Sequence, residues 1–232
     1  MNWTRTVLKL IAVIAPCLWV FFWHWQNNRY PEGDFANFFI SAQDLYQIYV
    51  NEPENLFNSI WVVRSRPYLL PALMLPFLII FQGKVLVSVL TFSVFFQLLC
   101  VLGFYRLTRY LFESPHREIF TIIIFTVPWA INRSYYFSTE LPLMTAVFWA
   151  LCFLIEAQQF DKFAPTIKAA FFCFLAVAIR PSLGSLILLP AIFGHIIYLR
   201  LSHKINKTDL FLSLTLVLLY ALAFLSCFQR GY

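Results

Sequence analysis

The stretch from Val85 to Tyr105, VLVSVLTFSVFFQLLCVLGFY, contains 21 consecutive residues without a charge. A helix of that length spans about 30 Å, which is the thickness of the hydrocarbon core of a bilayer. Backbone polar groups find no water in lipid, so such a run must satisfy them within a helix. A second uncharged run, Leu210 to Phe228, has 19 residues. Both runs predict membrane-spanning helices.

The composition of the whole chain points the same way. Of 232 residues, 61% are hydrophobic and 12% are charged, whereas soluble domains carry about 25% charged residues. So few charged residues cannot cover a protein surface that faces water. The apolar runs do not alternate polar and apolar residues, which disfavours a β-barrel. The sequence predicts an all-α, polytopic transmembrane protein and excludes a soluble globular domain.

Apolar runs bounded by charged or polar clusters predict about seven spans. Their expected bounds are 8–25, 85–105, 119–137, 141–155, 169–179, 183–199 and 210–228. A polar outer loop, 26–66, and a Pro-rich interfacial or re-entrant segment, 67–83, separate the first two. Arg5 and Lys9 precede the first run as in a signal peptide, but no small-residue cleavage site follows it, so we expect a retained helix. The chain is expected to form one transmembrane module, 1–232, without a separate soluble domain.

The orientation is predicted from the basic residues, which tend to stay on the cytoplasmic side. If the N-terminus is cytoplasmic and segment 67–83 does not cross, 10 of the 17 basic residues lie inside. If that segment crosses and the N-terminus is outside, the count is 11 of 17, so counting does not separate the two topologies. We favour the first, because Arg5 and Lys9 directly precede the first helix, which usually sets orientation. The expected location is the cell (inner) membrane.

Several features carry no separate function. Loop charges account for the net charge of +6, and no nucleic-acid-binding motif accompanies it. All five cysteines lie within apolar runs without a C-x-x-C pair, so neither disulfides nor a zinc site are expected. Four acids lie at cytoplasmic ends and are expected to be solvated: Glu113, Glu118, Glu156 and Asp161.

Two acids on the expected outer surface are candidates for chemistry. Asp34 lies nine residues past the first apolar run, and Glu140 lies between the third and fourth runs. Ionisable groups near the bilayer are costly, so a functional role is the default hypothesis. Either acid could instead mark the start of a helix, because an apolar-periodic stretch follows Asp34 and a Leu-Pro-Leu sequence follows Glu140. For Asp34, spacing alone leaves the two interpretations even.

Four arginines share the expected outer side: Arg64, Arg66, Arg133 and Arg180. The forked donors of a guanidinium group suit phosphate. Any one of these arginines is explained as well by snorkelling toward the lipid headgroups. Taken together, four arginines and two acids on one face would suit a lipid-linked phosphate.

At these residues the chain resembles the GT-C class of membrane glycosyltransferases, which take sugar from a polyprenyl phosphate. The resemblance is to protein mannosyltransferases, aminoarabinose transferases and related polyprenol-dependent mannosyltransferases, and it covers nearly the whole chain. It rests on the order and spacing of short motifs, each weak alone. These motifs are Gly33-Asp34-Phe35, a loop helix over 36–50, Arg66-Pro67-Tyr68-Leu69-Leu70-Pro71, Phe81-Gln82-Gly83, Phe104-Tyr105-Arg106-Leu107-Thr108-Arg109, Glu140-Leu141-Pro142 and Arg180-Pro181.

The resemblance implies a non-spanning segment 67–83 and a mechanism. Asp34 would act as general base on an acceptor hydroxyl. Polyprenyl phosphate would leave, steadied by Arg66 and less surely by Arg64, Arg133 or Arg180. Glu140 would assist Asp34, or the two acids would hold Mg²⁺ or Mn²⁺. Two carboxylates cannot fill the oxygen shell of such a cation, so metal dependence stays an alternative.

The resemblance also implies partners and departures. The partners would be a polyprenyl-phosphate-linked sugar and membrane lipids, with no nucleic acid. Family enzymes are longer, so this chain is expected to be a minimal enzyme, a half that needs a complementing membrane subunit, or a truncated form. Phe35 stands where some branches carry a second acid. Two alternatives stay open: a non-catalytic GT-C-like protein that binds lipid or a partner and, less favoured because no internal repeat is present, a small transporter or flippase.

Overall fold

The computed structural model describes residues 2–27, 34–62, 69–126, 139–157, 162–180, 184, 187–188 and 192. Within these ranges the regular structure is helical and contains no strand. The chain divides into two compact units, Met1–Thr145 and Ala146–Tyr232. The predicted all-α class is confirmed for the described residues. The expected span 210–228 and most of 183–199 lie outside them.

Two long helices, α1 (Asn2–Asn27) and α5 (Val85–Thr108), belong to the first unit. The stretches Thr6–Asn27 and Val85–Thr108 are long and apolar enough to cross a membrane. They contain the expected spans 8–25 and 85–105. Among the described helices, these two meet the length and hydropathy required of a membrane span.

Three shorter helices coincide with other expected apolar runs. They are α6 (His116–Thr126), α8 (Glu140–Glu156) and α9 (Phe163–Ile179). The expected run 119–137 begins inside α6, and its part from residue 127 onward lies outside the described residues. The runs 141–155 and 169–179 lie inside α8 and α9. The apolar pattern therefore located these helices, although their described lengths do not establish seven spans.

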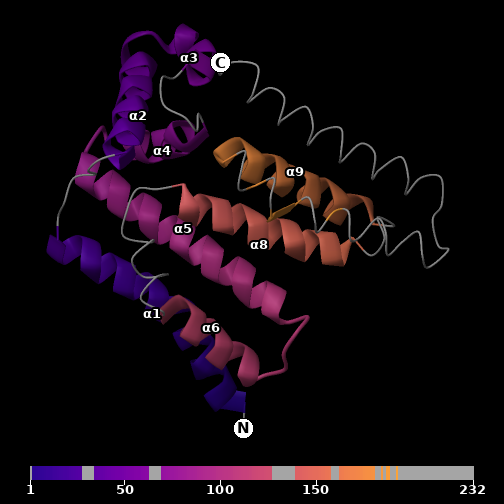
Figure 1. Cartoon of the computed structure of the whole chain (residues 1–232). Helices are drawn as coiled ribbons and strands as arrows, with labels where there is room; N and C mark the ends of the chain where they lie inside the picture. The colour runs from indigo at the N-terminus through magenta and orange to yellow at the C-terminus, as the bar shows by residue number, and fades with distance from the viewer. Residues whose placement is uncertain are drawn as a thin grey trace, which may run out of the picture. The chain divides into compact units, whose positions relative to one another are not determined.

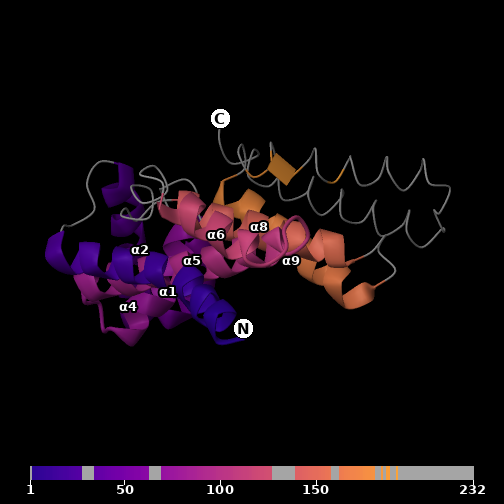
Figure 2. The same cartoon turned by 90° about the horizontal axis from the view of Figure 1, so that it is seen from below.

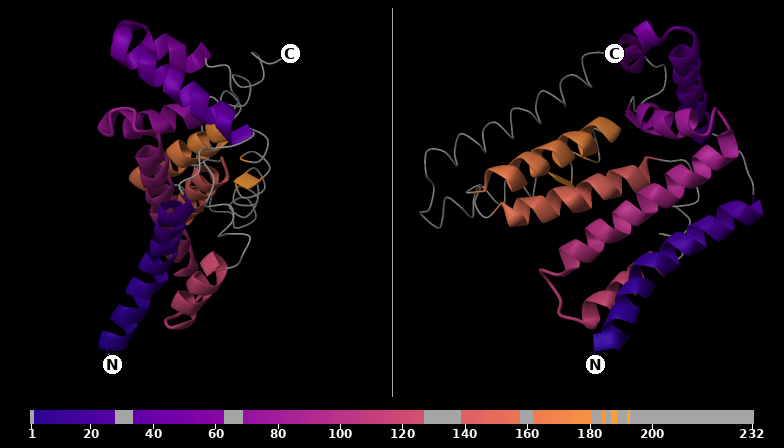
Figure 3. Two further views of the ribbon diagram at one scale, coloured as in Figure 1. Left: turned by 90° about the vertical axis from the view of Figure 1, so that its left-hand side faces the viewer. Right: turned by 180° about the vertical axis from the view of Figure 1, so that it is seen from behind.

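Helices α1, α5 and α6 pack against one another in the first unit. The N-terminus of α1, the end of α5 and the start of α6 lie at one end of this group (Figures 1 and 3). Aromatic rings join α5 to α6, because Phe104 lies 5.9 Å from Phe120 and 5.6 Å from Phe125 between centroids. The short connection between α5 and α6 makes the two helices antiparallel neighbours.

The other end of the first unit holds short helices from the expected outer loop 26–66 and from the expected segment 67–83. They are α2 (Asp34–Asn51), the 3₁₀ turn η1 (Pro53–Asn55), α3 (Leu56–Val62) and α4 (Leu69–Ile80). Helix α2 packs on α4, and α4 packs on α5. Figures 1 and 3 show α2 and α4 at the end of this unit opposite the N-terminus of the chain, and Figure 2 shows the same helices from below. The loop helix expected over 36–50 is present as α2.

The core of this end is apolar and aromatic. Leu45 of α2, Leu70 and Leu78 of α4, and Phe92 of α5 are almost fully buried. The Phe77 ring of α4 contacts α5, with centroids 5.5 Å from Phe92. Burying such side chains stabilises the packing by about 1.5–3 kcal/mol each when the exposed reference is water.

A tight turn joins α4 to α5. Gln82 and Gly83 have φ of +53° and +75°, and the Gly83 N–H donates to the Leu78 carbonyl at 2.8 Å. The Gln82 N–H also donates to the Ile79 carbonyl at 3.2 Å, so the two bonds end α4 by a Schellman arrangement with Gln82 as the left-handed cap residue. A Cβ atom on Gly83 would lie 2.9 Å from Cε1 of Tyr46 in α2. Glycine at this position therefore allows both the turn and the close approach of α2.

The second unit contains the end of α8 and the whole of α9. The Phe172 ring of α9 stacks on Trp149 and Phe153 of α8, at centroid distances of 6.1 and 5.7 Å. The ammonium group of Lys168 lies 5.5 Å from the centroid of the Phe153 ring. These aromatic contacts join the two helices.

A large apolar face of α1 is exposed in the first unit. Its side chains are between 45% and 68% exposed: Leu10, Ile11, Ile14, Leu18, Trp19, Phe22 and Trp25. Soluble monomers rarely expose contiguous apolar patches of this kind. Such a face is stabilised by contact with an apolar medium rather than with water.

Candidate functional site

Asp34 is the first residue of α2. The interpretation of Asp34 as an acid at a helix start is therefore confirmed. A helix start also fixes the backbone from which a catalytic carboxylate would project, so the two interpretations are compatible.

Glu140 occupies the equivalent position at the first residue of α8. The preceding residue, Thr139, is buried, and its carbonyl accepts the Leu143 N–H at 3.0 Å. Pro142, which is buried as well, fits the first turn because N–H groups there have no intrahelical partner. Glu140 is half-buried, and its Oε2 atom is shielded from solvent.

The first turns of α8 are attached to the middle of α5. The Thr145 hydroxyl is buried and lies 3.2 Å from the Phe96 carbonyl of α5 and 2.9 Å from the Leu141 carbonyl in its own helix. Thr145 lies about 7.5 Å from Glu140 along the helix axis, given a rise of about 1.5 Å per residue. This contact holds the start of α8, which carries Glu140, against α5.

The remaining candidates are the four arginines. Arg180 follows α9 in extended conformation, and its N–H donates to the Ala176 carbonyl at 3.1 Å. It is half-buried and belongs to the second unit, whereas Asp34 and Glu140 belong to the first. Arg64, Arg66 and Arg133 lie outside the described residues. The expected meeting of acids and arginines at one site therefore stays a prediction.

The divalent cation suggested by the family resemblance requires several oxygen ligands. Within the described ranges, no group of three or more His, Cys, Asp or Glu side chains could hold a metal ion. Asp34 and Glu140 alone would leave most of the shell of Mg²⁺ to other ligands. The metal role of Asp34 and Glu140 therefore stays a prediction, and the chemistry below does not depend on it.

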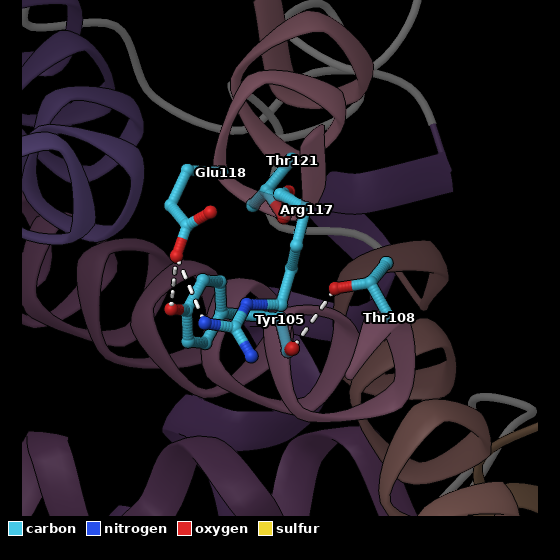
Figure 4. A network of polar contacts seen from close by, with 5 residues as sticks. All are labelled: Tyr105, Thr108, Arg117, Glu118 and Thr121. Carbon is cyan, nitrogen blue, oxygen red and sulfur yellow. Dashed lines mark hydrogen bonds and ion pairs between the residues drawn. The ribbon is translucent and has the colours of Figure 1, made fainter. Parts of the chain in front are cut away.

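A buried polar network lies at the other end of the first unit, where α5 ends and α6 begins (Figure 4). Oε1 of Glu118 accepts hydrogen bonds from the Tyr105 hydroxyl and from Nη2 of Arg117, both at 2.9 Å. The Arg117 guanidinium also lies 4.6 Å from the centroid of the Tyr105 ring. Glu118 is 0% exposed and the Arg117 side chain 14%.

The expectation that Glu118 would be solvated is therefore wrong. Helix α6 begins at His116, before the apolar run, so Glu118 is already helical and faces α5. Glu113, in the connection before α6, is exposed as expected. A sequence signal was available, because a tyrosine in the last turn of one apolar helix and an Arg-Glu pair at the start of the next can meet across a short connection.

Protonation of Glu118 is controlled by its partners. Burial by itself would raise the pKa of this carboxyl, but hydrogen bonds from Arg117, the backbone and Tyr105, together with the Arg117 charge, lower the pKa to about 2. The carboxyl is therefore ionised at neutral pH. A carboxylate held this way joins two helices and is poorly suited to accept a proton during catalysis.

The two candidate acids thus each begin a helix, Asp34 at α2 and Glu140 at α8, and both belong to the first unit. A structural network at the end of α5 had not been expected. Comparisons of this chain with family models, with curated proteins and with solved structures found no match.

Proposed function

We propose that this chain is an integral membrane glycosyltransferase that moves a sugar from a polyprenyl phosphate to an acceptor hydroxyl at the outer membrane face. The observation that carries the proposal is the placement of both candidate acids, Asp34 and Glu140, at the first residue of a helix in one compact unit. The order of motifs shared with GT-C enzymes supports the same function.

The membrane part of the proposal rests on helix lengths and exposed faces. Helices α1 and α5 are long and apolar enough to span, and the exposed apolar face of α1 suits lipid chains. Helix α4 has 12 residues, which corresponds to about 18 Å and falls short of a hydrocarbon core of about 30 Å. This length supports a segment 67–83 that lies in the interface or re-enters. The full proposal is seven spans with a cytoplasmic N-terminus.

The reaction is a displacement at the anomeric carbon. Asp34 takes the proton of the acceptor hydroxyl while the acceptor oxygen forms a bond to that carbon. The bond between the anomeric carbon and the phosphate oxygen breaks, and polyprenyl phosphate leaves with the electron pair. Arg66 neutralises the leaving phosphate, with Arg64, Arg133 and Arg180 as further candidates. Glu140 orients Asp34 or the acceptor.

The first experiment measures how sugar transfer depends on the two acids. Membranes containing the protein are supplied with polyprenyl phosphates that carry tritiated mannose, glucose or aminoarabinose, and loss of label from the lipid is followed. Asp34→Asn and Glu140→Gln should abolish transfer at unchanged protein amounts. Asp44→Asn, an exposed position of the same α2 helix, and Glu54→Gln, exposed in η1, serve as controls. Transfer that survived both acid substitutions would exclude this enzymatic role and leave a non-catalytic lipid-binding protein.

The second experiment measures the dependence on lipid donor. Arg66→Ala should raise the donor concentration needed for half-maximal transfer at least tenfold, since a hydrogen bond to a charged group is worth about 1.5–3 kcal/mol. Lys84→Ala is the control, because Lys84 is an exposed cation just before α5. If both variants required the same donor concentration as the unchanged protein, Arg66 would have no part in binding phosphate.

A further inference from the structure

The connection between α5 and α6 presents an unusual surface. We call residues 109–115 the hairpin tip. Leu111 is 70% exposed, and the neighbouring Tyr110 and Phe112 are 45% and 38% exposed. Three consecutive large apolar or aromatic residues are rarely presented to water at a turn. The surroundings of the hairpin tip are therefore expected to be partly apolar.

The backbone of the hairpin tip is suited to a partly apolar environment. The N–H groups of residues 109 to 112 all donate to carbonyls at the end of α5, at distances between 2.8 and 3.2 Å. An N–H group without a partner would cost free energy on leaving water. Because these donors are already paired, residues 109 to 112 of the hairpin tip can enter the headgroup region without that cost.

Contacts with α6 also hold the hairpin tip in place. The Phe112 ring packs on Phe120 of α6 with centroids 5.0 Å apart. The buried contacts of Tyr105, Arg117 and Glu118 join the last turn of α5 to the first turn of α6. Phe112 is thereby turned toward α6, and Leu111 is the most exposed apolar side chain of the turn.

Basic residues lie in the hairpin tip and at the same end of the first unit. Arg109 is exposed in the turn, and Lys9 is exposed on α1, which packs on both α5 and α6 and starts at the same end of this helix group as the turn (Figures 1 and 3). The Arg117 charge is neutralised by Glu118. Glu113 is the one acid in the sequence of the hairpin tip. A protruding leucine with an exposed arginine in the same turn, and a second exposed cation at the same end of the unit, complements an apolar layer covered by negative charge.

We propose that the hairpin tip docks on anionic phospholipid headgroups, with Leu111 in the interface and Arg109 and Lys9 on lipid phosphates. The proposal rests on the membrane location and topology given above, which place this turn at the cytoplasmic leaflet. Polar and aromatic groups with an apolar body favour this zone of a bilayer, and basic residues beside a membrane are attracted to anionic lipid.

The first test titrates phosphatidylglycerol into the full chain in neutral detergent and follows the thermal unfolding midpoint. The midpoint should rise with phosphatidylglycerol but not comparably with phosphatidylcholine or with inorganic phosphate at equal ionic strength. Arg109→Gln should need about fivefold more phosphatidylglycerol for the same rise, equivalent to about 1 kcal/mol for one cation. Lys84→Gln, at the opposite end of α5, should respond like the unchanged protein. Equal responses to the two lipids, or equal losses in the two variants, would overturn the proposal.

The second test places an environment-sensitive dye on Leu111→Cys in phosphatidylcholine–phosphatidylglycerol vesicles, with the unchanged chain as control for labelling of native cysteines. The dye emission should shift to the blue and be quenched by nitroxide-labelled lipid chains. An emission at the aqueous wavelength would contradict lipid docking. A blue shift without quenching would place position 111 against protein, in the same chain or a second copy, and would also overturn lipid docking. Neither test measures sugar transfer, so failure here and failure of the glycosyltransferase proposal are separately visible.

Discussion

Among single residues, Glu118 is the buried acid whose polar contacts join α5 to α6. Its carboxylate is fully buried and accepts hydrogen bonds from Tyr105 and Arg117. Breaking a buried ion pair by removing one partner leaves the other charge uncompensated and costs about 3–5 kcal/mol, whereas replacing both partners by apolar residues is often neutral. Comparing the single with the double replacement therefore separates the contribution of the ion pair to stability from that of side-chain packing.

Removal of one partner should destabilise the protein strongly. Glu118→Gln leaves Arg117 buried without its counter-charge, and we expect a loss near the lower end of about 3–5 kcal/mol because Arg117 is 14% exposed. Thermal unfolding in detergent measures the change. The double variant Arg117→Met/Glu118→Leu should recover most of it, and Glu113→Gln, at an exposed position, should have little effect. If the double variant were less stable than Glu118→Gln, the ion-pair explanation would fail.

The same carboxyl predicts a pH dependence. Its pKa is about 2 in the folded protein and 4.5 in the reference state. A lowered folded pKa contributes stability that is complete above pH 4.5 and is lost as the pH falls toward 2. The difference in unfolding midpoint between the unchanged protein and Glu118→Gln should therefore shrink over this window. A difference that stayed constant from pH 6 to pH 3 would contradict the assignment.

At the scale of elements, the placement of α2 depends on the turn between α4 and α5. Tyr46 of α2 lies against Gly83, where no Cβ atom could be accommodated without movement. Asp34 begins the same α2 helix. A displacement of α2 would thus move the residue that the proposed reaction uses as its base.

Substitution of the turn glycine should both strain the turn and displace α2. In Gly83→Ala the residue keeps a φ of +75° and its Cβ atom meets Tyr46 at 2.9 Å, so we expect a loss of about 1–3 kcal/mol. Thermal unfolding measures this loss. Adding Tyr46→Ala should relieve the contact and change the effect of the glycine substitution, while the backbone strain remains. Strict additivity of the two substitutions would show that they do not interact.

At the scale of the whole molecule, the proposed topology assigns opposite sides of the membrane to the two ends of the first unit. Cysteines introduced at exposed positions report on this. Glu54→Cys in η1 should react with an impermeant thiol reagent added outside intact cells, and Glu113→Cys in the hairpin tip should react only after permeabilisation. Labelling of both positions from the same side would contradict the proposed topology. It would also contradict the placement of Asp34 on the outer side of the membrane.

Much of the described fold was predictable because long uncharged runs leave the backbone few choices. Long uncharged runs must be helical to satisfy their own hydrogen bonds, and α1, α5, α8 and α9 contain the expected runs. The helix starts at Asp34 and Glu140 were also anticipated from the apolar pattern that follows each acid. The joint site with Arg64, Arg66 and Arg133 was not tested, because those residues lie outside the described part of the chain.

The sequence by itself determined which segments are apolar helices and where acids stand at their starts, because these properties depend on neighbouring residues. Only the tertiary structure decided which helix faces meet. Glu118 is buried because α6 turns it toward Tyr105, 13 residues away in the chain, and Gly83 is confined because α2 brings Tyr46 onto the turn. Both contacts depend on how one helix is rotated against another, which the order of charged and apolar residues along the chain does not specify.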